Sequence, residues 1–133
     1  MALPHFDLTS KIIGAFYKVY NELGYGYSEK IYRRALAIVL REGGLEAVEE
    51  QELRVVFHGH VIGICFFDIV VNGVVLVEVK VSGERQVSDE AQTLNYLKCA
   101  GGGTALLVNF GRELKYKRLV KGDPEANLPN LHG

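Results

Sequence analysis

The stretch 66-FFDIVVNGVVLVEVK-80 is dense in β-branched and aromatic residues and is interrupted once, at Asn72-Gly73. This composition predicts a β-hairpin. Asp68, Glu78 and Lys80 nevertheless lie among its apolar side chains. Moving an ionised carboxylate into a dry interior is costly, so these charges either reach solvent, pair with each other or bind a ligand.

The second half of this stretch has two unlike faces. Alternate residues of a strand point to the same side. The odd positions from 75 to 81 are all valine, whereas the even positions run from Leu76 to Glu78 and Lys80. This pattern predicts a strand that is buried on both sides and whose charged end emerges into a cleft.

The length of the turn determines whether Asp68 faces Glu78. A two-residue type I′ turn at Asn72-Gly73 pairs position 68 with 77 and puts Asp68 on the valine face. A three-residue loop over 71–73 pairs 68 with 76, which makes the two carboxylates diagonal neighbours roughly 7 Å apart. A bulge or a two-residue shift in pairing has the same effect. A site that uses both carboxylates therefore predicts an odd-length turn or a bulge.

Asp68, Glu78 and Lys80 on one face are typical of a metal site for phosphate chemistry. Mg²⁺ is commonly bound by one or two carboxylates and keeps several waters. A bound water is activated by the metal, and an adjacent Lys can orient it or neutralise charge on the phosphate. The alternative is structural: Asp68 accepts backbone N–H groups, and Glu78 and Lys80 form a weak surface ion pair.

Helical and strand periodicities flank the hairpin and predict the order ααβββαββ. We expect an α/β (α+β) fold with a central mixed β-sheet flanked by helices. One helix is expected over 8–23, a second between Ser28 and Gly43, and a third that begins at an N-cap at Ser88. Three strands are expected within 52–81, and two more over 104–110 and 114–120.

Length and composition indicate one domain over residues 1–121, followed by a loosely held tail over 122–133 that has no periodicity. No apolar run approaches the roughly 20 residues of a membrane span, and the N-terminus lacks a signal-peptide pattern. We therefore expect a cytoplasmic protein without membrane contact. The net charge of −1 excludes a global basic field. The basic stretch 112–121 is either a solvated edge strand or a phosphate-binding strip.

Asp68, Glu78 and Lys80 resemble the motif of the PD-(D/E)xK nuclease superfamily, in which Asp and Glu bind Mg²⁺ on adjacent strands and Lys assists catalysis. The proline before the Asp is missing, because the motif here begins "FFD". Gly26 to Tyr32, "GYSEKIY", is similar to the signature of the GxxExxY family of that superfamily. The similarity extends from about Ile12 to Val120 and includes "EAQTLNYL" and "LLVNFG". It implies a restriction-endonuclease-like core.

The resemblance also implies further site residues. Glu29 is expected to reach toward the metal, although an acid in a first helical turn also suits the helix dipole and can pair with Arg33. Tyr32 either holds Glu29 or packs in the core. Gln92 and Tyr96 resemble the Q-x-x-x-Y motif of RecB-type nucleases, and their alternative role is a polar helix flank.

The expected function is that of a nuclease that hydrolyses phosphodiester bonds of nucleic acid, with DNA the expected substrate. Mg²⁺, with Mn²⁺ as a substitute, is the implied cofactor, bound by Asp68, Glu78 and Glu29. The alternative is a catalytically silent module that binds nucleic acid or a protein partner. A homodimer stays open. Local basic candidates for substrate contact are Arg33, Arg34, Arg85 and Lys115.

Overall fold

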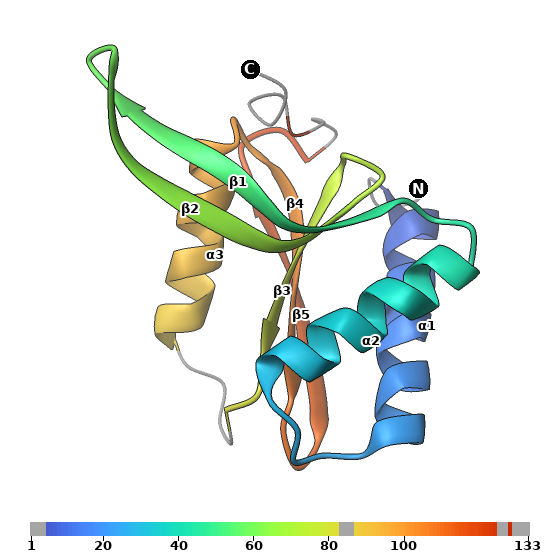
Figure 1. Ribbon diagram of the computed structural model, residues 1–133. Helices are drawn as coiled ribbons and strands as arrows, with labels where there is room; N and C mark the ends of the chain where they lie inside the picture. The colour runs from blue at the N-terminus through green and yellow to red at the C-terminus, as the bar shows by residue number, and fades with distance from the viewer. Residues whose placement is uncertain (1–4, 83–86, 125–127, 129–133) are drawn as a thin grey trace.

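The structure, a computed structural model, describes residues 5–82, 87–124 and 128. Its elements follow the predicted order ααβββαββ (Figure 1). Their bounds are α1 Phe6–Leu23, α2 Glu29–Glu42, β1 Ala47–Phe57, β2 His60–Val71, β3 Val75–Lys80, α3 Val87–Cys99, β4 Gly103–Phe110 and β5 Leu114–Lys121.

The five strands form one mixed sheet in the order β1-β2-β3-β4-β5. Three neighbouring pairs are antiparallel, and β3 pairs with β4 in parallel. Parallel neighbours need a crossover connection, which α3 provides. The sheet, with three helices around it, is consistent with a restriction-endonuclease-like α+β fold, as predicted.

Helices cover both faces of the sheet, so two apolar cores form. The helices α1 and α2 pack on one face, and α3 packs on the other (Figure 1). The strand β3 lies between the two cores and is buried along its length except at Lys80, which is half-buried. The two-sided burial predicted from its valine and leucine residues is confirmed. None of the helices in the described ranges is long and apolar enough to span a membrane.

The structure differs from the prediction at the start of β1 and at the start of α3, and it adds a contact in the C-terminal tail. The strand β1 begins at Ala47, about five residues earlier than expected, and the acidic Glu49 and Glu50 are held there by Arg33 of α2 at 3.5 and 3.2 Å. The helix α3 begins at Val87, so Ser88 lies inside the helix and is not its N-cap. Leu128, within the segment expected to be loosely held, is buried, and its N–H donates to the Gly73 carbonyl.

Candidate functional site

The turn between β2 and β3 is a three-residue loop, Asn72 to Val74, so the predicted odd length is confirmed. Val71 pairs with Val75 and Ile69 with Val77. The loop lies one residue later than expected, and the pairing is shifted by two residues, which places Asp68 opposite Glu78. Asn72 has a left-handed φ of 52° and exchanges hydrogen bonds with the backbone of Glu46.

Asp68 and Glu78 lie where β2 and β3 stop pairing through their backbones. The Asp68 N–H donates to Glu78 Oε1 at 3.1 Å, and the Val79 N–H donates to Asp68 Oδ2 at 2.7 Å. Each carboxylate thus accepts a hydrogen bond from a backbone N–H of the opposite strand. These reciprocal bonds hold the two carboxyl groups together at the point where the strands diverge.

The charge of this pair is poorly compensated. Glu78 is only 3% exposed, and burial, followed by the charge of Asp68, raises the pKa of Glu78 to about 8. Lys80 acts in the opposite direction but does not cancel the effect. A proton or a cation therefore stabilises the pair, because either one reduces the repulsion between the two carboxylates.

Lys80 and the helix α3 meet beside the carboxylates. Lys80 Nζ donates to Gln92 Oε1 at 3.2 Å. Tyr96 lies one turn further along α3 and packs on the Phe67 ring, with centroids 5.5 Å apart. Burial and then the charge of Glu78 raise the pKa of Tyr96, so its phenol stays protonated at neutral pH. The structure thus brings Gln92 and Tyr96 to the same side of the sheet as Glu78.

Glu29 is not gathered with this group. It is the first residue of α2 and is exposed. Over residues 5–82, 87–124 and 128, no three His, Cys, Asp or Glu side chains lie close enough together to hold a metal ion. Arg33, considered above as a partner for Glu29, pairs instead with Glu49 and Glu50.

Tyr32 is a core residue and does not contact the carboxylate pair. It is fully buried and stacks on Phe110 with centroids 4.6 Å apart. Its hydroxyl donates to the Gly24 carbonyl at 2.5 Å, which ties the start of α2 to the end of α1. The packing role considered for Tyr32 is therefore the observed one.

The sequence interpretation missed Asn109. It pairs with Lys80 across the parallel strands and is only 6% exposed. Its Nδ2 donates to the Ser82 carbonyl at 2.7 Å, whereas its buried Oδ1 has no hydrogen-bond partner among the described residues. The available signal was a single amide at the end of the apolar strand "GTALLVNF".

The candidate substrate contacts are scattered. Arg34 is exposed, and Arg85 falls outside the described residues. Lys115 Nζ lies 3.9 Å from Glu113 Oε2. Another exposed cation is Arg112, whose guanidinium lies 5.9 Å from the centre of the Tyr25 ring. The described candidates therefore lie on different elements: Arg34 on α2, Lys115 on β5 and Arg112 between β4 and β5.

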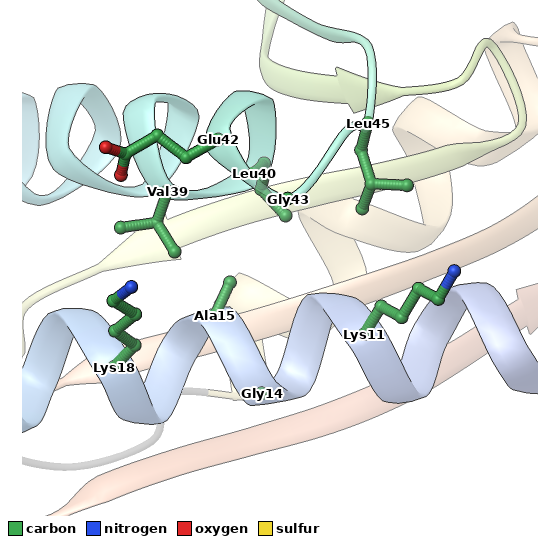
Figure 2. A pocket seen from close by; sticks show the side chains of 9 residues that line it. All are labelled: Lys11, Gly14, Ala15, Lys18, Val39, Leu40, Glu42, Gly43 and Leu45. Atoms are coloured by element: carbon green, nitrogen blue, oxygen red, sulfur yellow. The ribbon is translucent and has the colours of Figure 1, made fainter.

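A cavity of about 400 Å³ lies between α1 and α2 (Figure 2). Its floor is apolar, with Ala15 and Leu40, and its rim carries Lys11, Lys18 and Glu42. Neither Asp68, Glu78 nor Lys80 lines it. The cavity is therefore separate from the carboxylate pair.

Comparisons with known proteins agree with the fold. The family model of the PD-(D/E)XK nuclease superfamily matches residues 6–120. No curated protein matches the sequence. The crystal structure of the protein SSO0001 superposes with a TM-score of 0.55 at 18% identity, over 78% of this chain. This chain spans 55% of the length of SSO0001, and the likeness shows the fold alone. The matched family model covers most of the sequence, and the chain belongs to the PD-(D/E)XK nuclease superfamily, whose members are usually nucleases that use divalent metals.

Proposed function

We propose that this protein is a Mg²⁺-dependent nuclease of the GxxExxY branch that hydrolyses phosphodiester bonds of nucleic acid, with DNA as the expected substrate. The observation that carries the proposal is the pair formed by Asp68 and Glu78, held by reciprocal backbone hydrogen bonds. A buried Glu78 beside a half-buried Asp68 costs stability, and perturbed carboxyl groups of this kind are concentrated at functional sites.

The donor atoms fit a hard divalent cation. Asp68 and Glu78 offer only oxygen ligands, which suit Mg²⁺ and Mn²⁺ better than softer metals. Glu29 is the proposed additional acid, acting directly or through a water, because its exposed side chain is free to turn. A bound divalent ion at this position supplies Lewis-acid activation of water and of the phosphate.

Lys80 is the proposed stabiliser of the charge that develops on the phosphate. The hydrogen bond from Nζ to Gln92 limits the directions that the ammonium group can take. A preorganised cation is more effective than a mobile one, because it does not reorganise during the reaction. Tyr96, with its raised pKa, keeps its proton and is a donor for a phosphate oxygen or the nucleic-acid backbone.

The first test separates metal binding from cleavage. Binding of Mg²⁺ and Mn²⁺ is measured by calorimetry, and cleavage is measured on single-stranded, duplex and branched DNA. We expect Asp68→Asn to lose both metal binding and DNA cleavage. We expect Lys80→Ala to keep metal binding and to lose cleavage by at least about a hundredfold, the range for removal of one preorganised electrostatic group. Lys98→Ala, which removes an exposed lysine from the same side of the molecule, is the matched control and should cleave normally.

Two results would contradict the proposal in different ways. If the wild type binds neither cation and cuts no substrate, the enzyme assignment is wrong. If the wild type binds DNA without cutting it, and Asp68→Ala leaves binding intact or strengthens it, the silent binding module is the correct function, because loss of a carboxylate reduces repulsion of phosphate.

A further inference from the structure

The outer half of the β1–β2 hairpin exposes an unusual amount of apolar surface. Six of its apolar side chains are each more than half exposed. We call five of them the outer face: Val56, Val61, Ile62, Ile64 and Phe66. Both strands extend past the rest of the sheet as an arm (Figure 1). Single exposed apolar residues are common, but a contiguous group of this kind marks an interaction site.

The strand register places these five residues on one side. Phe66 pairs with Glu52, Ile64 with Arg54, and Val61 with Val56. The register shifts between Val55 and Val56, so Ile62 is an extra residue of a bulge. Two adjacent residues of such a bulge share a side of the sheet, which puts Ile62 and Val61 together.

The opposite side of the same hairpin is covered. Leu53 and Phe67 are buried and belong to the core that α3 closes. The helix α2 lies on the same side of the sheet as the outer face, but its ion pairs reach only Glu49 and Glu50 at the start of β1. The outer face is therefore a sheet surface that no described element of the chain covers.

The size of the outer face suits a protein partner. Five side chains that are more than half exposed present roughly 500 Å², the size of the largest apolar patch on a typical monomer. A stable interface buries about 800 Å² on each partner. The unpaired edge of β1 supplies further area beside the patch.

The charges beside the patch favour a second copy of this chain over nucleic acid as the partner. Glu52 and Arg54 lie next to the apolar residues on β1, with 3.6 Å between Arg54 Nε and Glu52 Oε1. One acid and one base give no net attraction to phosphate, so nucleic acid is not the occupant. A twofold axis places Glu52 of one copy near Arg54 of the other, and an apolar patch is complementary to itself.

We propose that this chain forms a homodimer in which the outer faces of two hairpins pack against each other. Sheets that pack face to face bury their apolar sides in this manner. The dimer does not depend on nuclease activity, since none of the outer-face residues belongs to the carboxylate site.

The test is the mass of the full chain in solution, measured by sedimentation equilibrium across a concentration series. We expect twice the 14.8 kDa of one chain for the wild type. Ile64→Lys introduces a charge into the middle of the face and should weaken association at least tenfold. Ile38→Lys replaces an equally exposed isoleucine on α2 and is the matched control, so it should associate like the wild type.

A charge swap tests the twofold arrangement. Arg54→Glu places two acids on each copy and should weaken the dimer, and adding Glu52→Arg should restore it. Circular dichroism and thermal unfolding establish that each variant folds. A wild type that stays monomeric at about 100 μM, far above the dissociation constants of standard interfaces, would overturn the proposal. The same conclusion follows if Ile64→Lys associates as strongly as Ile38→Lys.

Discussion

Glu78 occupies a position that stability alone does not explain. It lies between Leu76 and Lys80 on one face of β3, and the core that this face meets is apolar, so a valine or leucine there would fill the space without a desolvation cost. The pair with Asp68 adds repulsion to that cost. A residue that breaks the local pattern without a structural gain is expected at functional sites.

The raised pKa of Glu78 predicts an unusual pH dependence of stability. The ordinary value of 4.5 applies to the unfolded chain, and the value in the folded chain is about 8. Between these values the folded state binds more protons, so the free energy of unfolding should fall as pH rises from 4.5 and level off above about 8. Urea unfolding of the metal-free protein in EDTA, from pH 4.5 to 9, measures this slope.

Glu78→Gln is the informative variant for this prediction. Its amide oxygen still accepts the Asp68 N–H, and its NH₂ group can donate to the Asp68 carboxylate. We expect the variant to lose the slope and to exceed the wild type in stability at pH 9. Parallel profiles for the two proteins would show that Glu78 does not titrate in this range.

At the residue scale, the sequence predicted the arrangement of the strand residues Glu78 and Lys80 better than the positions of Glu29 and Asn109. Strand alternation correctly put Glu78 and Lys80 on one face, because period two is a local property of the backbone. The position of Glu29 depends on how α2 docks, which no local pattern determines. Asn109 was missed because its environment arises from the parallel pairing of β4 with Lys80, a contact between distant parts of the chain.

Among the elements, the β2–β3 hairpin shows what determines the pairing register of two strands. "NG" predicts a turn but is compatible with both even and odd loops. The observed loop is fixed from outside the hairpin, since Asn72 bonds to the backbone of Glu46 ahead of β1 and the Gly73 carbonyl accepts from Leu128. The local sequence pattern does not contain these distant contacts. It therefore left the turn length open, and the three-residue alternative was placed one position too early.

A pair of glycine substitutions tests the conformation of this loop. Gly73 has a left-handed φ of 68°, and no atom lies within 4 Å of the position that a Cβ would take, so Gly73→Ala adds backbone strain alone. We expect it to cost about 1 kcal/mol in the free energy of unfolding, measured with urea. Gly14 lies inside α1 with equal space, so Gly14→Ala should instead stabilise by about 0.8 kcal/mol. Equal effects of the two variants would contradict the left-handed loop.

For the whole molecule, the order of elements was predictable because hydrophobic periodicity changes clearly between helices and strands. The mixed sheet followed from a helix between the third and fourth strands, which produces the parallel pair β3–β4. The early start of β1 was not predictable, since its acidic residues disfavour a strand and are accommodated there by ion pairs with Arg33 and Arg41 of α2.

The tail provides a prediction at the same scale. Leu128 is 1% exposed and packs in the core that α3 closes, beyond the boundary placed after residue 121. We expect Leu128→Ala to lower the free energy of unfolding by about 2–4 kcal/mol, the range for a buried leucine. Thermal or urea unfolding measures the loss. A change within about 0.5 kcal/mol, typical of surface positions, would instead support a loosely held tail.

The short loop between Asp68 and Glu78 also has a consequence for the order of assembly. Only nine residues separate them, and a hairpin closes in roughly 1–10 μs. Glu29 lies 39 positions before Asp68 in the chain, so it takes its final position only when α2 docks on the sheet. Folding therefore brings the two strand carboxylates together before the docking of α2 fixes the position of Glu29.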